Sequence, residues 1–145
     1  MKNMTLTLGV LLCISLLLWT GRSFAEEFFG AKFMTQKEAK NKWGSAPFSA
    51  KNFKKSSEKE KGAMAAHAVD GKSFAGQDML KVREQMGDPD SYFFSDTIYA
   101  YMITSNAKPK QESWQLVFIP DENLKKVADV KIHKKCCYEV PEWAK

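Results

Sequence analysis

The residues best suited to chemistry stand close together near the end of the chain, in the run His133-Lys134-Lys135-Cys136-Cys137. An imidazole and two thiols are ligands that Zn(II) or Cu(I) accepts, which makes this His-x-x-Cys-Cys run a candidate metal or redox site. A closed zinc site needs a fourth ligand, and the sequence has neither a Cys-x-x-Cys nor a His-x-x-x-His pattern. We therefore predict no metal site and keep His133, Cys136 and Cys137 as the alternative.

Cys136 and Cys137 also raise the question of a disulfide. Adjacent cysteines can be joined only through a strained ring, and strain makes such a bond easier to reduce. An oxidising compartment disfavours long-lived free thiols, whereas the two neighbouring lysines favour the reactive thiolate. We favour a disulfide, either within the pair or to another chain, over inert thiols, and we place metal or redox function third.

No catalytic constellation accompanies these residues. The chain has two histidines and lacks the Gly-x-Ser-x-Gly, His-Glu-x-x-His and phosphate-cradling glycine patterns. Asp88 and Asp90 flank Pro89 in a predicted turn, where aspartates commonly bond to their own backbone. We predict a protein that is not an enzyme, with no catalytic residue and no cofactor.

Residues 1–25 have the features of a secretory signal peptide. Lys2 supplies the positive start, an apolar run follows, and Ser23-Phe24-Ala25 places small residues where a signal peptidase cleaves. An uncleaved anchor is the alternative, but the run is shorter than the roughly 20 residues that a bilayer span needs. Removing this segment lowers the formal charge from +5 to about +3, too little to indicate a nucleic-acid partner. We expect a periplasmic or secreted protein, with no stable membrane insertion after cleavage.

Three helices are predicted from caps and periodicity. The first spans 36–42, with Thr35 as its cap and Gly44 at its end. The second follows the capping box of Ser57 and Glu60 and stops at Asp70-Gly71. The third spans 77–86, because Gly87 and Pro89 end it and its apolar stripe excludes Lys81, Arg83 and Glu84.

Three strands follow, at 97–104, 114–119 and 127–133, and short connections make them an antiparallel meander. The expected fold class is α+β, with two or three N-terminal helices packed on one face of a three-stranded antiparallel β-meander. We expect the helices to cover the face of Ile98, Ala100 and Met102. The opposite face is then a candidate protein-binding face, unless the Phe-rich N-terminal segment covers it; its residues are Tyr99, Tyr101, Trp114, Lys131 and His133.

The chain divides into four predicted parts. Residues 1–25 are the signal peptide, and 26–70 form a basic, aromatic-rich segment with a short helix and a second helix. Residues 71–138 form the α+β core domain, and 139–145 a C-terminal tail. Whether 26–56 cover the sheet or form a separate binding segment stays open at this point.

Residues 76–132 resemble the SmpA/OmlA-like family, the small lipoprotein of the outer-membrane β-barrel assembly machinery, and the wider group of β-lactamase-inhibitor-like domains. The similarity rests on a glycine-led helix (Gly76, Val82), the Gly87-Asp88-Pro89 stop, an aromatic strand, and an acidic turn at Asp121 after Phe118. Two features depart from that pattern: Glu26 stands where the family has a lipid-modified cysteine, and the Cys136-Cys137 tail has no counterpart. The resemblance implies a fold and a habit of binding proteins.

These observations together predict an exported, non-enzymatic protein-binding module with a role in cell-envelope assembly or maintenance. The expected partner is another envelope or secreted protein. The alternatives are a thiol- or metal-handling protein that uses His133, Cys136 and Cys137, and an inhibitor of a secreted enzyme that acts through an open sheet face.

Overall fold

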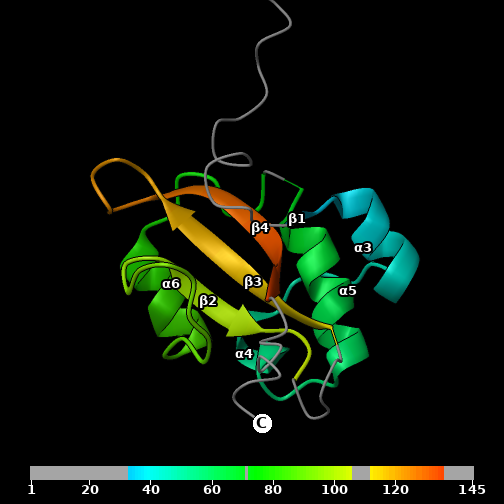
Figure 1. Ribbon diagram of the computed structural model, residues 1–145. Helices are drawn as coiled ribbons and strands as arrows, with labels where there is room; N and C mark the ends of the chain where they lie inside the picture. The colour runs from blue at the N-terminus through cyan, green and yellow to red at the C-terminus, as the bar shows by residue number, and fades with distance from the viewer. Residues whose placement is uncertain (1–32, 71, 106–111, 136–145) are drawn as a thin grey trace, which may run out of the picture. The chain divides into compact units, whose positions relative to one another are not determined.

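The computed structural model describes residues 33–70, 72–105 and 112–135. They belong to one unit of the chain, Lys32–Lys145. In these ranges an antiparallel sheet of four strands lies beside four helices, so the predicted α+β class is confirmed (Figure 1).

Two of the helices begin at capping boxes. Helix α3 (Gln36–Trp43) starts after Thr35, whose backbone N–H donates to Glu38 Oε2 at 2.7 Å while its hydroxyl accepts from the Glu38 N–H at 3.3 Å. Helix α5 (Glu58–Ala68) starts after Ser57 in the same way, with Glu60 as its partner. Both starts agree with the sequence prediction, because the cap is completed within four consecutive residues.

The other two helices are shorter. Helix α4 (Ala50–Phe53) was not predicted, and it buries Phe53 completely. Helix α6 (Met79–Met86) begins two residues later than expected, because Asp78 acts as its N-cap and accepts a hydrogen bond from the Leu80 N–H at 2.8 Å. It ends as predicted at Gly87, which has a φ of 78° that glycine adopts readily.

The sheet has the strand order β1-β4-β3-β2, all antiparallel. Strands β2 (Tyr99–Met102), β3 (Ser113–Pro120) and β4 (Val127–Lys135) form the predicted meander. The prediction of three strands is wrong in number. Strand β1 (Phe33–Met34) pairs with β4 at the outer edge, and its two residues are too few to show an alternating pattern in the sequence.

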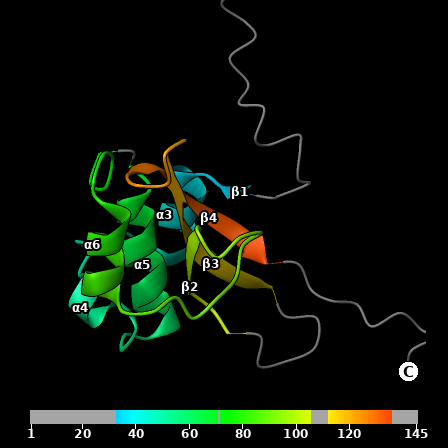
Figure 2. The same cartoon turned by 90° about the vertical axis from the view of Figure 1, so that its left-hand side faces the viewer.

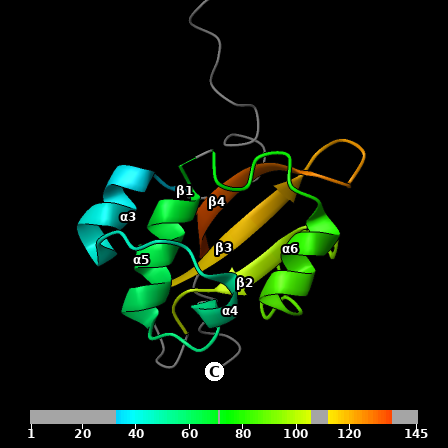
Figure 3. The same ribbon diagram turned by 180° about the vertical axis from the view of Figure 1, so that it is seen from behind.

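The helices cover one face of the sheet, as Figures 2 and 3 show. The expectation that Ile98, Ala100 and Met102 would face them is wrong. Because α5 presents mainly alanines to the core, large side chains of the sheet must fill the space between the two layers. The buried residues of that face are Tyr99, Tyr101, Ile103, Trp114, Leu116, Phe118, Val130 and Ile132.

Part of the opposite face lies under the segment between α6 and β2. The Ser91 N–H donates to the Ala100 carbonyl at 3.2 Å, and Asp90 Oδ1 accepts from the Met102 N–H at 2.7 Å. These contacts pair the segment with the edge strand β2, whose free backbone groups would otherwise be open to another chain. Ala100 is fully buried as a result of its position in the sheet and below this segment.

Helices α3 and α5 cross where a glycine leaves room for a tryptophan. A Cβ atom placed on Gly62 would overlap with Cγ and Cδ2 of the Trp43 ring. Trp43 is 9 % exposed and packs edge-on against Trp114, with ring centroids 6.2 Å apart. The indole therefore cannot move aside without disturbing the core, and Gly62 is required for the close approach.

Replacing Gly62 by alanine should therefore destabilise the protein, although Gly→Ala inside a helix normally stabilises by about 1 kcal/mol. We expect Gly62→Ala to lower the free energy of unfolding by about 1–3 kcal/mol, because the added methyl forces the Trp43 ring out of its position. Urea denaturation followed by tryptophan fluorescence measures the change. Lys59→Ala, at an exposed position of the same helix, is the control and should stay close to the wild type; a stabilised Gly62→Ala variant would contradict the tight crossing.

Candidate binding surface

The structure does not assemble the five residues predicted to form an open binding face. Tyr99, Tyr101 and Trp114 are 8 %, 0 % and 8 % exposed, because the helices cover them. The sequence left open whether these three side chains are exposed or covered, and the structure shows that they are covered. Part of that cover comes from the aromatic N-terminal segment, in which Trp43 contacts Trp114.

Lys131 and His133 lie on the opposite face of the sheet from the three aromatics. Lys131 pairs with Asp129 of its own strand, with Nζ 3.1 Å from Oδ2. The His133 ring packs between two phenylalanines, with centroid distances of 5.6 Å to Phe33 and 4.6 Å to Phe93. These two residues therefore do not share a surface with the tyrosines.

His133 is part of a hydrogen-bonded cluster around the buried amide of Gln115. Nε2 of Gln115 lies 3.3 Å from the Tyr92 carbonyl, which can only accept, so the amide nitrogen must point that way. The same nitrogen lies 3.0 Å from Nδ1 of His133. Oε1 of Gln115 accepts from the Ser91 hydroxyl. Nδ1 of His133 is therefore the acceptor, which requires the neutral ring with its proton on Nε2.

Cys136 and Cys137, the residues of the predicted disulfide, lie outside the described residues. Within the described ranges, no group of three His, Cys, Asp or Glu side chains is close enough together to hold a metal ion. Nδ1 of His133, one donor of the alternative metal site, is already occupied by Gln115.

A different surface is built where α6 ends and the chain turns toward β2. The hydroxyl of the fully buried Tyr101 donates to the Gly87 carbonyl at 2.9 Å. Nζ of Lys54, from the residue that follows α4, donates to the Asp88 carbonyl and lies 5.6 Å from the Tyr101 ring centroid. Tyr101 of the sheet and Lys54 next to α4 thereby both hold the Gly87-Asp88-Pro89 turn in place.

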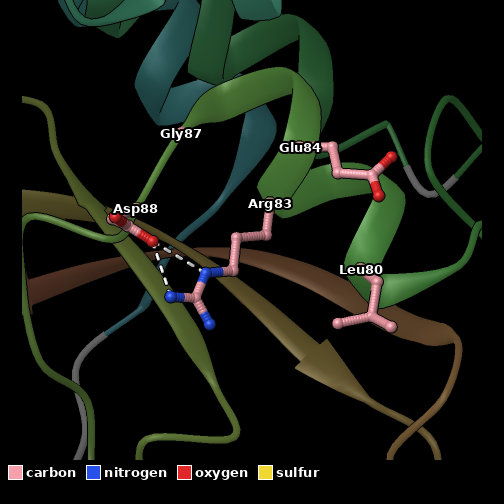
Figure 4. Close-up of a pocket in the computed structure, with 5 residues that line it drawn as sticks. All are labelled: Leu80, Arg83, Glu84, Gly87 and Asp88. Carbon is pink, nitrogen blue, oxygen red and sulfur yellow. Dashed lines mark hydrogen bonds and ion pairs between the residues drawn. The ribbon is translucent and has the colours of Figure 1, made fainter.

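An ion pair crosses the outer side of this turn. Oδ1 of Asp88 accepts from Nε of Arg83 at 2.9 Å and from its terminal nitrogen at 2.6 Å (Figure 4). The Arg83 guanidinium also lies 6.0 Å from the centroid of the Tyr99 ring. The hydrogen bond that Arg83 donates to Asp88 is the main cause that raises the pKa of Arg83 above its ordinary value. We call this pair the Arg83–Asp88 ridge.

A shallow hollow lies on each side of the Arg83–Asp88 ridge. The α6 hollow, about 420 Å³ in volume, is lined by Leu80, Arg83, Glu84, Gly87 and Asp88. The loop hollow, about 270 Å³, shares the ridge and includes Tyr92, Asp96 and Tyr99 in its lining. Sizes of this order suit one or two side chains of another molecule.

Exposed apolar side chains accompany both hollows. Leu80 is 63 % exposed in the α6 hollow, and Tyr92 is 59 % exposed in the loop hollow. The Tyr92 ring is held in place because its hydroxyl donates to the Phe94 carbonyl at 2.6 Å. Phe94 itself has a φ of 55°, which a non-glycine residue adopts only when its surroundings require it. The loop therefore holds the Tyr92 ring in a fixed position at the surface.

Leu80, Arg83, Asp88 and Tyr92 were not predicted as site residues from the sequence. The sequence held part of the signal. Arg83 and Glu84 stand three and four residues after Leu80, so the three side chains share a helix face away from the apolar stripe. The exposure of Tyr92 carried no local signal, since Tyr92, Phe93 and Phe94 are adjacent aromatics and only Phe93 is buried.

Comparison with known protein families, with curated proteins and with solved structures found no match to this chain. The fold described above places it in the α+β class with an antiparallel sheet. In the part of the chain that the structure describes, no helix combines the length and apolar character needed to cross a membrane.

The hydroxyl of Tyr101 should contribute to stability separately from its ring. Burial raises the pKa of this phenol, so it remains a donor across the neutral pH range. Tyr101→Phe removes only the bond to Gly87 and should cost about 1 kcal/mol of unfolding free energy. Tyr101→Ala removes a fully buried ring and should cost about 3–5 kcal/mol. Urea denaturation compares the two, and a Tyr101→Phe variant as stable as the wild type would show that the hydroxyl does not hold the turn.

His133 should make stability depend on pH. Burial lowers the pKa of His133 below its ordinary value, and the bond from Gln115 requires the neutral ring. The unfolded chain then binds more protons than the native one, so the contribution is fully present above about pH 6.5 and is lost as pH falls through the lowered pKa. We expect the free energy of unfolding to decline between about pH 7 and 5, and to decline less in His133→Asn, whose amide oxygen can replace Nδ1 as acceptor.

Acid titration of carboxylates that accept hydrogen bonds, including those of the helix caps, is a competing effect in that experiment. The pKa values of Glu38 and Glu60 are lowered by hydrogen bonds from Thr35 and Ser57, so those carboxylates lose stabilising charge only below about pH 5. A direct check is the imidazole pKa of His133 measured by NMR. A value at or above that of free histidine would refute the neutral-ring assignment.

Proposed function

We propose that this chain is a non-enzymatic protein-binding module that acts in the periplasm or outside the cell. The observation that carries the proposal is the surface around the Arg83–Asp88 ridge, where Leu80 and Tyr92 are more than half exposed beside two hollows. Large apolar side chains held out of the core, next to polar groups, are typical of protein-protein interfaces.

The Arg83–Asp88 pair gives the ridge a fixed geometry. Oδ1 of Asp88 accepts two hydrogen bonds from Arg83, so the two side chains hold each other in place in the absence of a ligand. The same rigid pair is well suited to giving an interface a fixed shape.

A role in cell-envelope assembly or maintenance, with another envelope or secreted protein as partner, rests on two features of the sequence. Residues 1–25 have the pattern of a secretory signal. The resemblance to the SmpA/OmlA-like family rests in part on Gly87-Asp88-Pro89, and these residues form the turn that shapes the candidate surface. The motif behind the resemblance and the exposed surface therefore coincide.

Two alternative functions receive less support. Inhibition of a secreted enzyme through an open face of Tyr99, Tyr101 and Trp114 is not retained, because helices cover that face. A thiol- or metal-handling role through His133, Cys136 and Cys137 is weakened by the engagement of His133 with Gln115. It is tested by Cys136→Ser and Cys137→Ser, each of which should abolish any such activity.

The proposal is tested by cross-linking the full chain in its native cells and comparing variants. Leu80→Ser and Tyr92→Ala should each weaken capture of one stoichiometric partner by about tenfold, in the presence or absence of reductant, since each removes an exposed anchor. Leu80 is exposed, so its replacement should change the free energy of unfolding by less than about 0.5 kcal/mol. Tyr92→Ala also removes the hydrogen bond to the Phe94 carbonyl and should cost about 1 kcal/mol.

Lys37→Ser, at an exposed position of α3, is the control and should capture the partner as the wild type does. Unchanged capture by both Leu80→Ser and Tyr92→Ala would remove this surface from the function. A partner that is retained only without reductant would favour the thiol alternative instead.

A further inference from the structure

The segment that follows Arg83 differs in the sign of its charge from the chain as a whole. The full chain carries a formal net charge of +5, yet residues 84–96 contain four carboxylates and no lysine or arginine. Three of the four carboxylates, Glu84, Asp88 and Asp96, line the two hollows of the candidate binding surface. The negative charge of this segment indicates which kind of partner the surface accepts.

Two of the four carboxylates are used within the fold. Asp88 is paired with Arg83, and Asp90 accepts the Met102 N–H at 2.7 Å. The charge of Asp88 is thus neutralised locally, and Asp90 is committed to the backbone of β2. Neither is available to attract a ligand of its own.

The other two carboxylates remain open. Glu84 and Asp96 are exposed, and within the described residues neither makes a hydrogen bond or an ion pair. Figure 4 shows the Glu84 carboxylate pointing away from Asp88, on the far side of the Arg83 side chain. The surface therefore keeps two unneutralised negative charges, one on each side of the ridge.

Each hollow combines one open carboxylate with one exposed apolar group. Glu84 lines the α6 hollow with Leu80, and Asp96 lines the loop hollow with Tyr92. We propose that this surface docks a segment of a partner protein in which lysine or arginine residues alternate with apolar side chains. The inference rests on the proposed binding function and adds to it the chemical class of the partner.

A basic and apolar segment satisfies each group of the surface. Its cations would meet Glu84 and Asp96, and its apolar side chains would cover Leu80 and the Tyr92 ring. Tyr92 also offers its ring face to a cation. An acidic segment or an anionic lipid surface is disfavoured, because it would meet two open carboxylates while the only nearby cation, among the residues lining the two hollows, is held by Asp88.

The test uses the full chain and a display library of random peptides as the probe. Peptides that are enriched by the wild type and lost with Tyr92→Ala should be rich in lysine or arginine beside leucine or aromatic residues. Their affinity should fall by about tenfold in the Glu84→Gln, Asp96→Asn double variant, and raising the ionic strength should weaken the wild type more than this variant.

The matched control is the double variant Glu122→Gln, Lys125→Gln, whose two exposed positions lie in the turn between β3 and β4. It should bind the selected peptides as the wild type does. The Gln and Asn replacements are nearly isosteric and exposed, so circular dichroism should report an unchanged fold for both double variants.

The outcomes separate this inference from the proposed function. Peptides that depend on Leu80 and Tyr92 but show no basic residues, or that bind the Glu84→Gln, Asp96→Asn variant equally well, would overturn the partner class and leave the binding function standing. If no peptide depends on Leu80 or Tyr92, both fail. A dimer of the chain that separates in the same variant would assign the surface to a second copy instead.

Discussion

The hydroxyl of Tyr101 joins the sheet to the end of α6, and the position of the exposed surface depends on that bond. Tyr101 is fully buried in β2, and its phenol reaches the Gly87 carbonyl at 2.9 Å. Because Gly87 leaves the helix with a φ of 78°, the chain turns at once and places Asp88 within reach of Arg83. A buried donor thus determines where an exposed ion pair stands, and through it the two hollows.

The loop that follows is held by a second set of buried polar contacts on the other face of the sheet. Gln115 bonds to the Tyr92 carbonyl and to Nδ1 of His133, while Ser91 donates to its oxygen. Buried polar groups of this kind are costly unless every partner is present, so the cluster specifies one loop conformation. The exposed ring of Tyr92 is the outer end of that arrangement.

Close packing of the helices on the sheet completes this arrangement. Gly62 lets the Trp43 indole approach α5, and Trp43 in turn packs against Trp114 of β3. The small residues of α5 and the large residues of the sheet are complementary, which explains why the aromatic face is the inner one. The outward-facing residues of α6 take no part in this packing and remain at the surface.

The sequence alone determined those features whose causes lie within a few neighbouring residues. The capping box of Ser57 and Glu60, the end of α6 at Gly87, and the order of the three longer strands were predicted, because each follows from local hydrogen bonding or from periodicity. The tertiary structure decided which face of the sheet is buried, where β1 pairs, and that Leu80 and Tyr92 are exposed. Those outcomes depend on contacts between residues far apart in the chain, such as Gln115 with Tyr92 or Trp43 with Gly62, which no local pattern encodes.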